Sequence, residues 1–242
     1  MTDPLYRTIL LFDIEQFGSR DDVEQAFLRR LLYEVVDATL LAAGIDESAR
    51  LRADRGDSVM ELIDVQASVP ALVKTLLTEA PALLHSKNRL IASSARMRLR
   101  MVLSAGYVAI DELDGWVGSD LNHAVRLLNS DPLRDALKQR DDHSVLCVSD
   151  GIYTGVVRHG PLGVRPDDFR RVTVETKEGP TVAWVHGVPE AAASCDATGV
   201  PDPVAPGPTT TSVFGDQYGM SGGTVHGDQR FNFARRDRDE RR

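Results

Sequence analysis

The sequence has only two cysteines, Cys147 and Cys195, and neither has a second cysteine or a histidine at the spacing of a metal site. Disulfide-stapled and zinc-binding classes are therefore disfavoured. No uncharged apolar run approaches the roughly 18 residues that a membrane-spanning helix needs, and the N-terminus lacks the charged-then-apolar pattern of a secretion signal. We expect a cytoplasmic protein without a membrane partner.

Positive charge is also scarce. Lys and Arg number 28 against 36 Asp and Glu, which gives a net charge of -8 and argues against a nucleic-acid partner. The chain contains no G-x-x-x-x-G-K-[ST] loop, so a P-loop NTPase is disfavoured. A nucleoside triphosphate (NTP) remains compatible with the sequence, because local arginines and metal ions can outweigh a negative average.

Composition divides the chain into four parts. Residues 1–189 alternate apolar runs with polar breaks and predict a globular domain. Residues 190–211 are small and Pro-rich, as in a linker. Residues 212–233 form a Gly-rich unit, and residues 234–242 are almost wholly charged and predicted to be solvated. We therefore expect one domain followed by a disordered C-terminal tail.

Hydrophobic periodicity predicts an α+β domain. The expected elements are, in order, a buried strand over 6–13, a helix over 21–43, a hairpin over 51–64, a helix over 69–84, a strand over 96–110, a short helix over 122–130 stopped before Pro132, a strand over 145–148, and a hairpin of strands 171–175 and 181–186. The order is βαββαβ with additions, as in ferredoxin-like folds. It favours an antiparallel sheet with helices on one face.

An acid stands where the first strand ends, in Phe12-Asp13-Ile14-Glu15-Gln16-Phe17-Gly18. The chain then turns into a helix, whose first N–H groups are free to meet an anion. An acid beside such a site is well placed for Mg²⁺ bound to phosphates. The alternative is that Asp13 only ends the strand and satisfies the turn.

A second acid stands at the tip of the predicted hairpin, in Arg55-Gly56-Asp57-Ser58. Two carboxylates on neighbouring strands could hold two divalent ions across one triphosphate. Gly and Asp also favour turns without any further role, so this alternative stays open.

The segment from Gly118 to Arg126 carries a third pattern. Asn122 and Arg126 are four residues apart and share a face of the predicted helix. An amide there could orient a sugar, and a guanidinium fork matches phosphate oxygens. The alternative is a surface helix with a polar stripe.

These motifs occur in the order found in the class III adenylate and guanylate cyclases. Phe12 to Phe17 matches the first motif, Gly56-Asp57 the hairpin, and Gly118 to Arg126 the G-x-x-(V/L)-N-x-A-x-R helix. A strand ending at Gly106 and a closing hairpin over 171–182 complete the series. Over residues 6 to 188 the chain resembles a class III nucleotidyl cyclase catalytic domain, which has a palm-type α+β fold and makes a 3′,5′-cyclic nucleotide and pyrophosphate from an NTP.

The resemblance implies roles for the residues around the first two motifs. Asp13 and Asp57, helped by the Ile14 carbonyl, would bind two Mg²⁺ or Mn²⁺ ions. One ion would lower the pKa of the 3′-hydroxyl, and the other would hold the leaving pyrophosphate. Amides near Phe17 and Gly18 would meet the β and γ phosphates.

The resemblance also implies a site shared by two chains. Asn122 would position the ribose, Arg126 would stabilise the pentavalent phosphorus, and Lys177 would contact the phosphate chain. In this family Asn122 and Arg126 would come from one protomer of a head-to-tail homodimer, and the two metal-binding acids from the other.

The base pocket departs from the purine-specific pattern. Ala53 stands where those relatives carry a lysine, although Arg52 is close, and the second base-reading position falls on Gly115 beside Trp116. Asp114 would serve only if the loop were shifted by one residue. Some relatives with altered base pockets are pyrimidine cyclases that act in phage defence, and others are inactive. The resemblance therefore does not favour ATP over GTP, CTP or UTP. It leaves a second function open, an inactive nucleotide-binding adaptor that recruits a partner through its tail.

The tail contains a short repeat. Gly215-Asp216-Gln217 recurs as Gly227-Asp228-Gln229, among alternating aromatic residues. Such a segment can stack into cross-β structure with glutamine ladders, and it resembles the amyloid signalling motifs at the ends of bacterial effector proteins. That resemblance implies a partner protein with a like motif. The alternative is an unordered tail.

Overall fold

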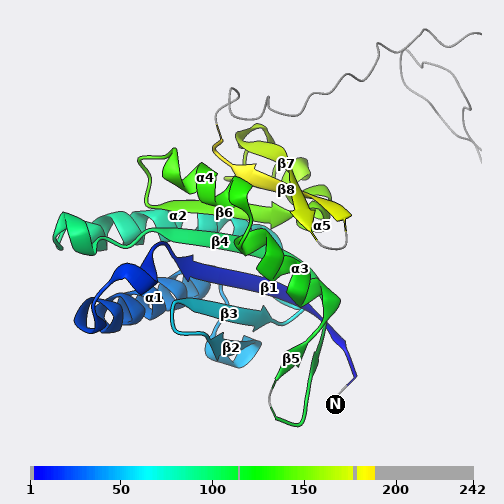
Figure 1. The fold of residues 1–242 in the computed structure, drawn as a ribbon. Helices are drawn as coiled ribbons and strands as arrows, with labels where there is room; N and C mark the ends of the chain where they lie inside the picture. The colour runs from blue at the N-terminus through cyan, green and yellow to red at the C-terminus, as the bar shows by residue number, and fades with distance from the viewer. Residues whose placement is uncertain (1–2, 114, 177–178, 189–242) are drawn as a thin grey trace, which may run out of the picture. The chain divides into compact units, whose positions relative to one another are not determined.

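The computed structural model describes residues 3–113, 115–176 and 179–188. Figure 1 shows these residues as one twisted sheet with helices packed on it. The predicted α+β fold is confirmed. Lys177, the predicted linker at 190–211, the Gly-rich segment at 212–233 and the charged tail at 234–242 lie outside the described residues.

The predicted strands and helices are present, with bounds shifted by a few residues. The strands are β1 (Leu5–Ile14), β2 (Arg50–Asp54), β3 (Ser58–Ile63), β4 (Leu99–Ile110), β5 (Trp116–Val117), β6 (Ser144–Ser149), β7 (Phe169–Thr176) and β8 (Gly179–His186). The α-helices are α1 (Asp22–Ala42), α2 (Val69–Asn88), α3 (Ser119–Leu128), α4 (Asp131–Lys138) and α5 (Asp150–Gly155). The segment from β1 to β4 has the predicted βαββαβ order, whereas β5, α4 and α5 were not predicted.

Helix α4 was not predicted, because Pro132 was interpreted only as the end of the preceding helix. Pro132 instead lies in the first turn of α4. A proline is tolerated there, since its missing N–H has no partner in the first turn and its φ suits a helix. The same residue therefore stops α3 and starts α4.

Strand β1 lies inside the sheet, whose order is β2-β3-β1-β4-β6-β8-β7, with β5 paired to β4. It pairs antiparallel with β3 and β4, whereas β4 and β6 are parallel. Seven consecutive residues of β1, from Thr8 to Ile14, are buried. A run of this kind indicates a strand that is covered on both faces.

Helices cover both faces of the sheet, so the prediction that they lie on one face is wrong. Leu10 and Phe12 of β1 belong to a core that includes residues of α1, α2 and α5. Ile9 and Leu11, which point the other way, belong to a second core with residues of α3 and α4. The apolar residues of α3 recur every three or four positions, at Leu121, Ala124, Leu127 and Leu128, and this stripe is buried against the sheet.

A buried charge network joins β2, β3 and α1. Glu61 of β3 is fully buried, and its Oε1 accepts hydrogen bonds from Arg50 Nη1 at 2.8 Å and Arg52 Nε at 2.5 Å. Asp37 Oδ1 of α1 accepts from the same two guanidinium groups at 2.7 and 2.5 Å. Burial raises the pKa of the Glu61 carboxyl, and the charges of Arg52 and Arg50 oppose this shift. The Arg52 guanidinium also lies over the Tyr33 ring, 4.8 Å from its centroid.

Two glycines let α3 approach β4 closely. Asp120, in the first turn of α3, accepts a hydrogen bond from the Tyr107 N–H at 2.7 Å and lies against Gly106. A Cβ at Gly106 would be 2.2 Å from the Asp120 Cβ, and one at Gly118 would be 2.6 Å from the Tyr107 carbonyl oxygen. The missing side chains at Gly106 and Gly118 therefore allow α3, which carries Asn122 and Arg126, to lie close to β4.

Glu61→Ala is expected to lower the free energy of unfolding by about 3–5 kcal/mol, because the guanidinium groups of Arg50 and Arg52, which are largely buried, lose the fully buried carboxylate between them. Urea unfolding measures the loss. The control is Glu34→Ala, which removes an exposed carboxylate paired with Lys87 and should cost less than about 1 kcal/mol. Equal losses in the two variants would contradict a special role for the buried network.

Gly106→Ala is expected to lower stability by about 1–3 kcal/mol through overpacking and to displace α3. Thermal unfolding and the backbone NMR shifts of α3 measure the two effects. Gly155→Ala is the matched control, because no atom of the described residues lies within 4 Å of a Cβ placed there. Unchanged α3 shifts in Gly106→Ala would show that the contact with Asp120 does not position the helix.

Candidate functional site

The end of β1 and the β2–β3 turn bring Asp13, Ile14 and Asp57 together. Asp13 is 8% exposed and lies opposite Ser58 in the antiparallel register. The Ile14 N–H donates to the Asp57 carbonyl oxygen at 3.0 Å, which ties the turn to the strand. The Asp57 residue is exposed. The two acids that the sequence singled out are therefore neighbours at one end of the sheet, where β1 stops and the β2–β3 turn lies.

The turn between β2 and β3 depends on a glycine. Gly56 has a φ of 91°, a conformation that other residues rarely adopt. Its N–H donates to Asp54 Oδ1 at 2.7 Å, and the Arg55 N–H donates to the Ser58 carbonyl oxygen at 2.9 Å. These bonds hold the turn in a defined shape with Asp57 at its tip.

Arg100 of β4 is part of this site, and the sequence analysis missed it. It lies opposite Asp13, and its Nε donates to Asp13 Oδ2 at 2.9 Å. Its Nη2 donates to the same oxygen. The strong alternation of residues 96–110 predicted a strand, but only the register with β1 brings this one arginine to Asp13.

The electrostatics of Asp13 reflect both neighbours. Burial raises the pKa of the Asp13 carboxyl, the positive charge and hydrogen bonds of Arg100 lower it, and the negative charge of Asp57 raises it again. The two carboxylates therefore repel each other across the site. A cation held between them would offset that repulsion.

Asp13, Asp57 and the Ile14 carbonyl could supply some of the ligands of a divalent ion whose remaining ligands come from a bound phosphate and water. The residues that the structure describes include no group of three or more His, Cys, Asp or Glu placed to hold a metal. Mg²⁺ in phosphate sites is usually held by one or two carboxylates, with phosphate oxygens and water as the other ligands. Asp13, Asp57 and the Ile14 carbonyl fit this donor set, and Arg100 donates both of its hydrogen bonds with Asp13 to the same oxygen, Oδ2.

The chain reverses direction immediately after β1. Gln16 has a φ of 57°, and Phe17 and Gly18 lie in the 3₁₀ turn Phe17–Ser19 that precedes α1. The Ser19 N–H donates to the Gln16 carbonyl oxygen at 3.3 Å. The turn places the backbone of Phe17 and Gly18 four and five residues along from Asp13, at the same edge of the sheet.

Asn122 and Arg126 lie one turn apart on α3, as predicted. Asn122 is exposed. Arg126 lines a groove of about 530 Å³ together with residues of α4 and with Thr173–Thr176 of β7. The predicted phosphate ligand Lys177 follows β7 directly but lies outside the described residues. The groove at Arg126 is lined by none of Asp13, Ile14 and Asp57.

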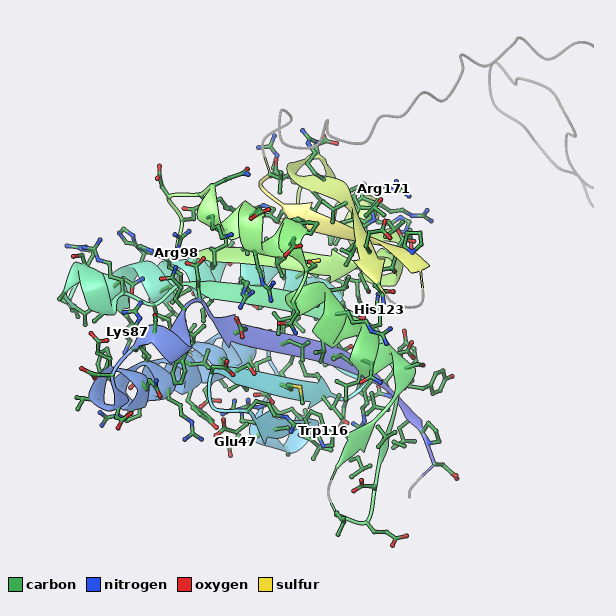
Figure 2. All side chains as sticks on the ribbon, in the orientation of Figure 1. Glu47, Lys87, Arg98, Trp116, His123 and Arg171 are labelled. Carbon is green, nitrogen blue, oxygen red and sulfur yellow. The ribbon has the colours of Figure 1, made fainter. Side chains whose placement is uncertain are left out.

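A second groove, of about 550 Å³, lies between β2 and the β5 hairpin. Its lining includes Ala53, Gly115 and Trp116, which the sequence analysis assigned to a base pocket. Trp116 is labelled in Figure 2. Arg52 also borders this groove, but its guanidinium is engaged by Glu61 and Asp37.

The carboxylate beside Gly115 belongs to Asp111, which the sequence analysis did not consider. Asp111 Oδ1 accepts hydrogen bonds from the N–H groups of Gly115 at 2.7 Å and Leu113 at 2.9 Å. A Cβ at residue 115 would be 2.5 Å from Asp111 Oδ2. Asp114, the residue considered earlier, lies outside the described residues.

None of the helices in the described ranges is long and apolar enough to cross a bilayer.

No protein-family model matches the chain, and no curated protein sequence matches it. Solved structures do match it. An adenylate/guanylate cyclase/hydrolase from Silicibacter pomeroyi is 17% identical with a TM-score of 0.55, covering 78% of this chain and 99% of that one. A bacterial light-regulated adenylyl cyclase is 15% identical with a TM-score of 0.54, covering 76% and 91%.

The guanylyl cyclase Cya2 is similar to the same extent, with 16% identity, a TM-score of 0.52, and 78% of this chain and 95% of that one covered. All three solved structures are named as adenylyl or guanylyl cyclases. The described domain therefore has the cyclase palm fold, as the resemblance implied.

Proposed function

We propose that this domain is a metal-dependent nucleotidyl cyclase that converts an NTP into a 3′,5′-cyclic nucleotide and pyrophosphate for signalling inside the cell. The observation that carries the proposal is the pairing of Asp13 and Asp57 at the end of β1, beside Arg100. The fold shared with cyclase catalytic domains supports it.

The residues at the end of β1 would bind the triphosphate. Asp13, Asp57 and the Ile14 carbonyl would hold two Mg²⁺ or Mn²⁺ ions, which when bound lower the pKa of the 3′-hydroxyl and neutralise charge on the phosphates. The amides of Phe17 and Gly18 would donate to the β and γ phosphates.

Arg100 would contribute to the same step. Its guanidinium is bonded to Asp13 Oδ2 in the structure. Its planar fork matches phosphate oxygens in the same way as a carboxylate. We propose that it turns from Asp13 to a phosphate when the ions and nucleotide bind, which leaves Asp13 to the metal.

A second copy of the chain would complete the site. Asn122 would orient the ribose and Arg126 would stabilise the charge that develops on the α-phosphate, a contribution that for charge clamps of this kind reaches about 10³ in rate or more. Both would come from the partner protomer, because within one chain the groove at Arg126 is lined by none of the acidic residues of the site. Lys177 would reach the phosphates from the end of β7.

Exposed apolar residues support such a homodimer. Leu5 and Tyr6 at the start of β1 are 55% and 48% exposed, and Tyr107 of β4 is 60% exposed. The rings of Tyr6 and Tyr107 meet edge to face at 5.4 Å. Val117 of β5, at 50% exposure, belongs to the neighbouring hairpin. Large exposed apolar groups of this kind often mark an interface.

The wild-type protein incubated with Mn²⁺ and each of the four NTPs is expected to form a cyclic nucleotide, detected by mass spectrometry. We expect no strict selectivity for ATP, because Ala53 offers no hydrogen bond with which to read a base edge. Asp57→Ala should abolish turnover and leave the melting temperature nearly unchanged, since residue 57 is exposed. Asp167→Ala, another exposed acid, is the control and should stay active.

Product from none of the four NTPs would favour the alternative, a nucleotide-binding adaptor without turnover. Full activity in Asp57→Ala would show that the metal site is assigned to the wrong residue. A large ATP preference that survives Trp116→Ala would show that the base groove is assigned wrongly.

Mixing Asp13→Ala with Arg126→Ala should restore part of the activity that each variant lacks, because a mixed dimer retains one intact site. The measurement is cyclic-nucleotide formation as a function of the mixing ratio, with each variant alone as the control. An active wild type alongside an inactive mixture would exclude a site shared between protomers.

We also propose that residues 212–233 form an assembly motif separate from catalysis. The support is in the sequence, namely the two Gly-Asp-Gln repeats and the Pro-rich segment before them. The isolated peptide should give a fibre-diffraction spacing of about 4.7–4.8 Å, and truncation after Pro208 should preserve NTP turnover. A peptide that stays soluble and unordered at high concentration, or an inactive truncated enzyme, would contradict the proposal.

A further inference from the structure

A basic pocket of about 380 Å³ lies at the edge of the sheet where β1 ends and β4 and β6 begin. We call this cavity the basic pocket. It is lined by Glu15, Gln16, Arg20, Ser93, Arg96, Arg98 and His143. Arg98 is labelled in Figure 2, just before β4. The proposed cyclase chemistry assigns no role to the basic residues of this pocket.

The pocket concentrates positive charge in a chain whose net charge is -8. Three arginines line it against one carboxylate, that of Glu15, which lies 3.5 Å from Arg98 Nε through its Oε2. The local excess is therefore two positive charges. A dianion would neutralise this excess.

Arg98 is held in place by the fold. Its Nη2 donates to the carbonyl oxygens of Leu137 and, at 3.1 Å, Arg140, which lie in the last turn of α4 and just beyond it. Arg20 Nη2 in turn donates to the Arg96 carbonyl oxygen at 3.2 Å. The guanidinium groups of Arg20 and Arg98 are therefore tied to the backbone around the pocket, which favours a pre-formed anion site over a chance grouping of mobile side chains.

His143 adds a neutral polar group to the same wall. Burial lowers the pKa of its imidazole, and the charges of Arg96, Arg98 and His85 lower it further, against a smaller opposing effect of Asp142. The His85 ring stacks near it, with centroids 6.4 Å apart. A neutral imidazole carries one N–H donor, and the Ser93 hydroxyl and Gln16 amide are further donors in the lining.

We infer that the basic pocket binds a phosphate dianion, either inorganic phosphate or the phosphate group of a small phosphorylated metabolite. The guanidinium fork matches phosphate oxygens, and the excess of two positive charges matches the charge of the ligand. The pocket adjoins the proposed triphosphate site, since Arg98, the residue before β4, and Arg100 within β4 are two residues apart in extended chain, roughly 7 Å. The inference does not depend on cyclase activity.

Titration of the full-length protein with inorganic phosphate, without metal or nucleotide, tests the inference. Isothermal calorimetry gives the affinity, and the ring resonances of His143 report where the ligand binds. Saturable binding that shifts the His143 resonances is expected. Arg96→Gln should weaken it about tenfold or more, the loss of one charge-assisted hydrogen bond, and Arg20→Gln should do the same. Arg165→Gln removes an arginine that is 82% exposed elsewhere and should bind like the wild type.

Asp57→Ala separates this inference from the proposed function. Phosphate binding that is unchanged in Asp57→Ala supports a pocket distinct from the triphosphate site, whether or not the wild type turns over an NTP. Competition between an NTP and phosphate would instead identify the pocket as the place of a nucleotide's terminal phosphate, and would overturn the inference. A lack of saturable binding, or equal affinity in Arg96→Gln and Arg165→Gln, would also overturn it.

Discussion

Burial of β1 on both faces is the constraint on which the rest of the domain depends. Helices α1 and α2 pack on one side of this strand and α3 and α4 on the other, so a polar side chain within it would face a dry core on either side. The strand remains apolar from Ile9 to Phe12, and its first buried charge, Asp13, stands where the sheet ends. The polar residues that could bind ligands or act in catalysis are therefore gathered where β1 ends.

Two buried carboxylates, those of Glu61 and Asp13, differ in the groups that surround them. Glu61 and Asp13 both have carboxyl groups whose pKa is raised by burial, and both are paired with arginine. Glu61 lies beneath α1 and receives two guanidinium groups, with Asp37 closing the network. This network joins β3 to β2 and α1. Asp13 has one arginine and faces a second carboxylate across a tight turn, which is an arrangement that favours an added cation.

The proposed site is divided between two regions of the chain, and this division has a structural cause. The acids lie where β1 ends, whereas α3 begins near the start of β1, where Asp120 is bonded to the Tyr107 N–H and Tyr107 pairs with Tyr6. A head-to-tail pair of chains would bring these opposite ends together. The exposed tyrosines at that end of the sheet agree with such an arrangement.

The sequence by itself determined the order and bounds of most elements, because apolar periodicity depends on neighbours along the chain. It also singled out Asp13, Asp57, Asn122 and Arg126, whose motifs are local. Only the tertiary structure decided that helices cover both faces, that Arg100 meets Asp13, and that Arg96, Arg98 and His143 share one pocket with Gln16. These depend on strand register and on contacts between residues far apart in the chain, and a shift of one residue in register would turn Arg100 to the opposite face.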